Sequence, residues 1–120
     1  MAVGQDRIIN TYEDQVRAGK LTLLVKSVER FWAGDGSGGQ EEQPGTFLDT
    51  TINVVGCSKR GSTLEKLAAE RKVRIYENKK EITNEPKGYS RLFYDDFLDN
   101  VKKDARYYLN NIGRAVKETM

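Results

Sequence analysis

A chain of 120 residues is long enough for one hydrophobic core and too short for two, so we expect a single domain spanning 1–120. Only 38% of the residues are hydrophobic and 32% are charged, which makes a lean core, and the net charge of +2 excludes the imbalance typical of disordered chains. Histidine is absent, which argues against Ser/His and Cys/His hydrolases and leaves carboxylates as the plausible metal ligands.

The first segment with a clear pattern is 5–18, which we expect to be a helix. Its apolar side chains recur at a spacing of three or four residues, and Gly19 offers a C-terminal cap. The apolar positions are Ile8, Ile9, Tyr12 and Val16.

The next segment, 21–32, fits both a helical stripe and a buried strand. We favour the strand, because Gly19 would break one long helix and a later strand needs a neighbour. Residues 34–45 contain five glycines, one proline and three acidic residues, which predicts a flexible glycine-rich loop.

Further along, 46–55 alternates as a strand, with Leu48, Thr50, Ile52 and Val54 on one face. Ser62 and Glu65 form a capping-box pattern, which predicts a short helix ending near Arg71. A third strand is expected over 73–77, followed by a brief return through Ile82.

The C-terminal segment predicts a long amphipathic helix over about 90–118, because apolar residues step at three and four positions along it. The fold class is therefore α+β. We expect a small, mainly antiparallel sheet packed with helices and closed by this long helix.

Function is inferred from what is unusual in this pattern. A lean core, an overlong helix and a glycine-rich loop favour a non-enzymatic assembly or adaptor subunit that binds a protein partner or a second copy of itself. The expected partner-binding residues are aromatic or lie on the helix stripe: Phe31, Trp32, Phe97, Val101, Tyr108 and Ile112.

The alternative is a nucleic-acid-binding accessory protein. Residues 57–80 carry eight basic and three acidic side chains, the only clear charge asymmetry in the chain. The candidate contacts for an anion or nucleic acid are Lys59, Arg60, Ser62, Lys72, Arg74 and Lys79.

Three catalytic patterns are weaker. The loop 56–63 follows a strand and opens a helix, but Ser62 stands where a phosphate-binding loop has lysine. Cys57 has no histidine to act as its base. The aspartates near the start of the predicted C-terminal helix complement the dipole of that helix. We expect no enzymatic activity, no metal and no cofactor.

The expected compartment follows from three features that the sequence lacks. One cysteine cannot form an intramolecular disulfide, and no run of about 18 apolar residues is present. The first residues also lack the apolar stretch of a signal peptide. We expect a cytoplasmic protein without a membrane partner.

Overall fold

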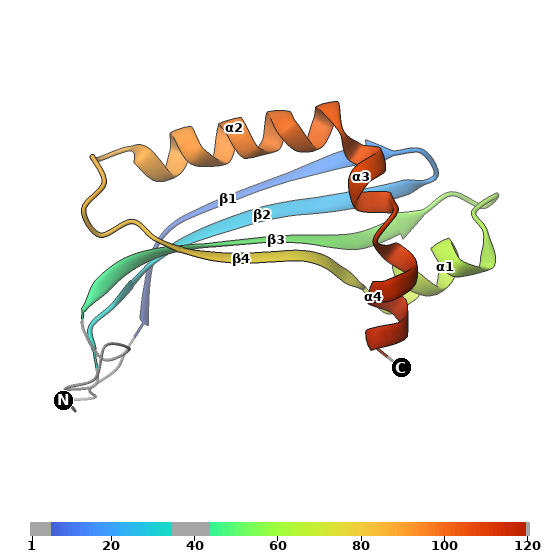
Figure 1. Ribbon diagram of the computed structural model, residues 1–120, viewed down its shortest axis with the longest axis horizontal. Coiled ribbons are helices and arrows are strands. Elements are labelled where there is room, and N and C mark those ends of the chain that lie inside the picture. Colours follow the sequence, from blue (N-terminus) through green and yellow to red (C-terminus); the bar gives the residue numbers. More distant parts are fainter. Residues whose placement is uncertain (1–5, 35–43, 120) are drawn as a thin grey trace.

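A computed structural model describes residues 6–34 and 44–119 of the chain (Figure 1). Its strands form one antiparallel sheet in the order β1-β2-β3-β4, so strands that follow one another in the sequence lie side by side. The strands are β1 (Asp6–Ala18), β2 (Leu21–Trp32), β3 (Gly45–Cys57) and β4 (Arg74–Glu81).

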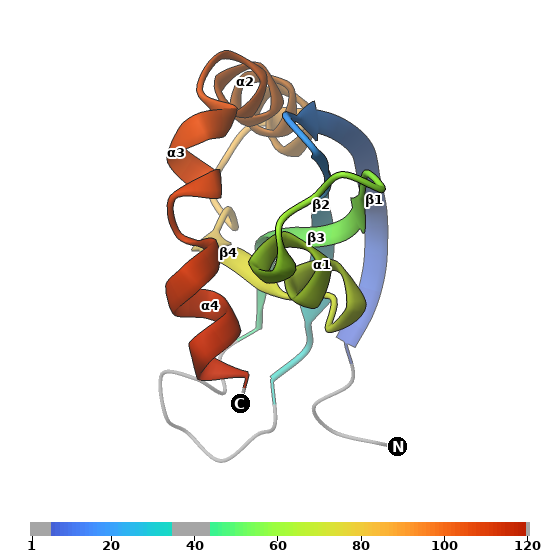
Figure 2. The ribbon, with the colours of Figure 1, turned by 90° about the vertical axis from the view of Figure 1, so that its right-hand side faces the viewer.

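The helices lie on one side of the curved sheet (Figure 2). α2 runs along the sheet, while α1, α3 and α4 gather at the end that holds the β1–β2 turn (Figure 1). Their bounds are α1 (Thr63–Glu70), α2 (Tyr89–Lys103), α3 (Ala105–Leu109) and α4 (Ile112–Glu118). The α+β class with an antiparallel sheet is thus confirmed. No helix in the described ranges is long and apolar enough to cross a membrane.

The helix predicted over 5–18 is wrong, because this segment is strand β1. Ala18 pairs with Leu21 across a tight turn in which Gly19 has a φ of +60°, so β1 and β2 form a hairpin. The pairing with β2 skips Ile9, which marks a β-bulge. That extra residue breaks the two-residue alternation and leaves an apolar spacing that imitates a helix.

The strands expected over 21–32 and 46–55 are confirmed as β2 and β3. The capping box at α1 is also present: Ser62 Oγ accepts from the Glu65 N–H at 3.2 Å, and Glu65 Oε2 accepts from the Ser62 N–H at 3.0 Å. The return through Ile82 is wrong, since β4 is one strand, and the N–H of Ile82 extends its pairing by donating to Thr46 O at 2.8 Å.

The long C-terminal helix is also wrong, since the segment bends into three shorter helices. Asp104 leaves helical geometry with φ −133° and ψ 48°, and Asn110 and Asn111 separate α3 from α4. Asp and Asn side chains compete with the helix for backbone groups, which favours breaks where they occur. The bends let the apolar stripe follow the curve of the sheet.

The apolar stripe of these helices lies inside the chain. Val101 is fully buried, and Ile112 and Tyr108 are 4% and 9% exposed. They join one core with the helix-facing side chains of the sheet, which include Leu21, Leu23, Val25, Ile52 and Val54. The stripe therefore closes its own domain.

Most of the loop predicted over 34–45 lies outside the described residues, which resume at Pro44.

Candidate functional site

The face of the sheet opposite the helices is a mixed polar surface. The strand register places Arg30 beside Phe47, and Asp49 beside Lys79. Opposite charges alternate across the strands, so the described residues of this face form no large area of one sign. The cations of this face are Arg17, Lys26, Arg30, Arg74 and Lys79, and its carboxylates are Glu13, Asp49, Glu77 and Glu81.

Phe47 is the centre of a compact cluster on this open face. The Lys79 ammonium lies 4.7 Å from its ring centroid, and the Arg30 guanidinium lies 5.2 Å from it. Arg30 also donates to Asp49 Oδ2 at 2.6 Å. The other carboxylate oxygen, Asp49 Oδ1, is buried and accepts no hydrogen bond within the described part of the chain. These contacts hold the Arg30 and Lys79 side chains against the Phe47 ring.

Apolar side chains are exposed at one end of the sheet, which we call the distal end and define as Ile8, Ile9, Phe31 and Trp32. Ile8 is 67% exposed and Ile9 42%, while the two aromatic residues are half-buried. The bulge at Ile9 places two consecutive isoleucines on an edge strand. The Arg7 guanidinium lies 5.8 Å from the ring centroid of Phe31. This end combines apolar contact area with a cationic rim.

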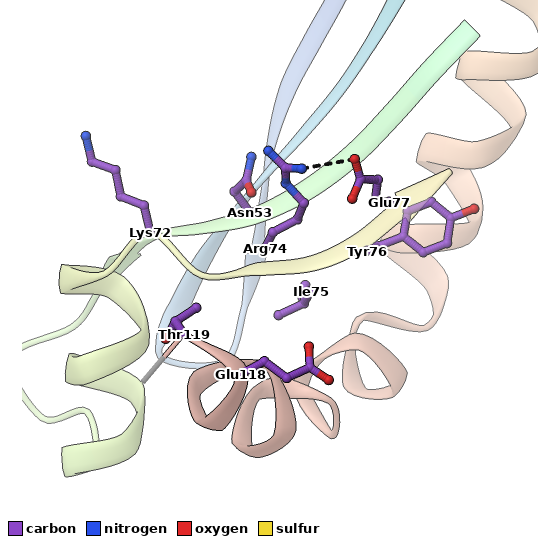
Figure 3. Close-up of a pocket in the computed structure, with 8 residues that line it drawn as sticks. All are labelled: Asn53, Lys72, Arg74, Ile75, Tyr76, Glu77, Glu118 and Thr119. Carbon is purple, nitrogen blue, oxygen red and sulfur yellow. Dashed lines mark hydrogen bonds and ion pairs between the residues drawn. The ribbon is translucent and has the colours of Figure 1, made fainter. Parts of the chain in front are cut away.

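A pocket of about 500 Å³ opens beside the start of β4. Figure 3 shows Asn53, Arg74 and Glu77 on one side of this strand, and Glu118 and Thr119 of the C-terminal segment on the other. Within it, Arg74 donates to Glu77 at 3.0 Å. The pocket therefore has both cationic and acidic walls. Its remaining lining residues are Lys72, Ile75 and Tyr76.

Lys72 stands out in this pocket because its φ is +52°, a left-handed conformation that favours glycine. The N–H of Lys72 bonds to Ala69 O and that of Val73 to Ala68 O, which is the hydrogen-bond pattern of a Schellman cap on α1. Among the described residues the Lys72 side chain has no ion-pair or hydrogen-bond partner. It is a free cation on a strained backbone.

Hydroxyl and carboxylate groups meet beneath α2. Ser90 Oγ lies 2.9 Å from the Tyr12 hydroxyl and donates to Glu29 Oε1 at 2.6 Å. The Tyr94 hydroxyl donates to Asp14 Oδ2 at 2.7 Å. Burial and this carboxylate raise the pKa of Tyr94 well above its usual range. These bonds join α2 to β1 and β2, so the cluster positions the helix.

The predicted partner-binding residues fall into three groups. Phe31 and Trp32 lie at the distal end, half-buried and accessible. Phe97 packs on Tyr76, with ring centroids 5.1 Å apart. The other three, Val101, Tyr108 and Ile112, belong to the core, and none is more than 9% exposed.

The predicted anion contacts are not brought together as one surface. Lys72 and Arg74 share the pocket, while Lys59 and Arg60 precede α1 in an exposed turn and Lys79 lies near the far end of β4. The hydroxyl of Ser62 is engaged in the capping box.

The weaker catalytic patterns acquire structural roles. The Cys57 thiol is half-buried and donates to Ser58 O at 3.3 Å. A Cβ at Gly61 would clash with Cys57 Sγ, so this turn needs glycine for close packing. Arg91 donates to Asp95 at 3.1 Å. No group of three potential metal ligands occurs within 6–34 and 44–119.

Ile8 and Ile9 were missed as surface residues by the sequence reasoning, which placed them on a helix. The signal that could have found them is a run of β-branched and aromatic residues before Gly19.

Comparison with protein-family models, with curated proteins and with solved structures finds no match to this chain.

Proposed function

We propose that this chain is a non-enzymatic assembly subunit that docks an apolar surface of a partner protein on its distal end. The observation that carries the proposal is the pair of exposed isoleucines on edge strand β1, at 67% and 42% exposure, at the same end of the hairpin as Phe31 and Trp32. Covering these side chains would remove apolar area from water, and a tryptophan among them suits an interface anchor. The nearby guanidinium of Arg7 favours a partner with an acidic rim.

The proposal predicts that Ile8→Glu together with Ile9→Glu weakens partner binding at least about tenfold, because the interface would have to bury two charges. The partner is first identified by mass spectrometry of the complex purified gently from its native source. Its Kd is then measured with each variant by calorimetry. Leu64→Glu is the matched control, since Leu64 is 43% exposed but lies on α1, at the opposite end of the sheet (Figure 1). Equal Kd values for the double variant and the wild type would contradict the proposal.

A second candidate function is binding of a nucleic-acid backbone at the pocket beside β4. It is favoured by the free cation of Lys72 beside Arg74, with the aromatic ring of Tyr76 on the same strand. The acidic walls from Glu77 and Glu118 oppose a polyanion, which makes this function the weaker of the two.

This second function predicts that Lys72→Gly lowers oligonucleotide affinity and reduces the salt slope by about one, because one phosphate contact is lost. Glycine suits the left-handed backbone at this position, so the variant is expected to keep its stability within about 1 kcal/mol of the wild type. Fluorescence anisotropy across a salt series measures the slope, and thermal unfolding checks the fold. Absence of wild-type binding at low salt would exclude the idea.

A further inference from the structure

β4 is an edge strand whose outer backbone groups have a defined direction. The N–H of Ile82 donates to Thr46 O of β3 at 2.8 Å. Backbone groups alternate in direction along an antiparallel strand, so those of Asn78 and Lys80 also face β3. The groups of Glu77, Lys79 and Glu81 therefore face away from the sheet, and all three residues are exposed.

The side chains along this edge are complementary to a second copy of the same strand. In an antiparallel pairing of two β4 strands centred on Asn78, Glu77 lies opposite Lys79 of the other copy, and Lys79 lies opposite its Glu77. Both residues project from the open face, because they are register partners of Thr51 and Asp49. Opposite charges at directly opposed positions stabilise a strand pair.

The same register also matches the backbone. It sets residue 77 opposite residue 79, so the outward-facing groups of one copy meet those of the other. The two neighbouring registers that also match the outward-facing backbone groups have unfavourable side-chain charges. A pairing centred on Glu77 places the two Glu77 carboxylates opposite each other. A pairing centred on Lys79 places the two Lys79 ammonium groups opposite each other. Charge and hydrogen-bond direction thus select one arrangement.

The pocket beside β4 adds a third complementary contact. In this register Ile75, which lines the pocket, lies opposite Glu81 of the second copy. Glu81 projects from the open face, as Arg74 does. Its carboxylate would therefore lie on the same face as Arg74, beside the pocket of about 500 Å³.

We infer that this chain forms a two-fold homodimer by antiparallel pairing of β4 with β4 of a second copy, giving one continuous eight-stranded sheet. The contact is self-complementary, as a two-fold interface requires. It leaves the distal end free, so it does not depend on the proposed partner site. Only about seven residues per copy pair, so the dimer forms at micromolar concentrations or above.

The test is a charge-reversal cycle followed by sedimentation equilibrium from 1 to about 500 µM, a span chosen around that affinity range. Glu77→Lys and Lys79→Glu are each expected to raise the dimer Kd about tenfold, because each replaces two attractive pairs by two repulsive ones. The double variant restores opposite charges at both pairs and is expected to return to within about threefold of the wild type. This rescue is specific to the dimer, since exchanging the two residues does not restore the ion pair of Glu77 with Arg74.

A second variant tests the backbone contact directly. Lys79→Pro removes an N–H that faces away from β3, so the sheet keeps its own pairing while the edge is blocked. We expect a folded monomer by circular dichroism and sedimentation. Glu13→Lys on β1 is the matched control and is expected to leave the Kd unchanged. A wild type that stays monomeric throughout the range, or a dimer that both reversals leave intact, would overturn the inference.

Discussion

Replacing Leu98 with alanine is expected to lower the free energy of unfolding by about 2–5 kcal/mol. Leu98 is only 8% exposed and belongs to the single core formed by the sheet and the C-terminal helices. Its removal leaves a cavity that the curved sheet cannot close fully. Urea unfolding followed by circular dichroism gives the free energy, and an unchanged slope with denaturant concentration would show that the two-state transition is retained.

The matched control lies on the same helix. Leu92→Ala makes the same chemical change at a side chain that is 71% exposed, so the expected effect is within about 0.5 kcal/mol. Equal losses at Leu98 and Leu92 would contradict the assignment of the apolar stripe to the domain's own core. That result would return the stripe to the role of a partner-binding surface.

The parts of the fold that the sequence predicted correctly rest on local chemistry. Ser62 and Glu65 satisfy each other's backbone groups over four residues, so the start of α1 needs no tertiary information. Strand β3 could also be predicted from the sequence, because its apolar residues alternate. The alternating residues, all buried on the helix side, are Leu48, Thr50, Ile52 and Val54.

The errors arise where tertiary packing decides the local structure. The bulge at Ile9 interrupts the alternation of β1, and only its pairing with β2 establishes the segment as a strand. The apolar stripe continues past Asp104, so periodicity alone could not locate the break. The break follows from the need of three helices to cover one curved sheet.

The same reasoning explains what was found of the candidate surfaces. Lys72 and Arg74 are near neighbours in sequence, so their shared pocket could be anticipated, and Phe31 with Trp32 ends β2 as an aromatic pair. The distal end as a whole could not be predicted, because only the pairing of β1 with β2 brings its residues together. The complementarity of Glu77 and Lys79 between copies also requires knowing which backbone groups face outward, which only the sheet order supplies.

Alkaline pH is expected to destabilise this protein through its buried tyrosines. Burial, then the hydrogen bond to Asp14, raises the pKa of Tyr94, whose side chain is 1% exposed. Burial also raises the pKa values of Tyr76 and Tyr108. An unfolded tyrosine loses its proton near pH 10, whereas the folded one retains it. Their stabilisation is therefore complete below about pH 10 and is lost as the pH rises toward the folded pKa.

Tyr94→Phe separates this effect from general alkaline unfolding. In the wild type, Tyr94 contributes a loss of up to about 1.4 kcal/mol per pH unit above pH 10, and the phenylalanine variant lacks that contribution. The free energy of unfolding of this variant at pH 7 is expected to be about 1–3 kcal/mol lower, because Asp14 loses a hydrogen-bond donor. The phenylalanine ring keeps its stacking on Tyr12, so no packing is lost there. The two stability curves should therefore converge as the pH rises. Denaturant unfolding at a series of pH values measures the stability difference at pH 7 and its change with pH. Tyrosinate absorbance provides a second readout.

The control for this experiment is Tyr107→Phe, since Tyr107 is 60% exposed and lies outside the polar cluster beneath α2. That variant is expected to run parallel to the wild type from pH 9 to pH 12, the range around the ordinary tyrosine pKa of about 10. If Tyr94→Phe also ran parallel, the Tyr94 hydroxyl would ionise in the fold as readily as in the unfolded chain. The polar cluster beneath α2 would then be open to solvent, and the position of α2 would depend on the apolar stripe alone.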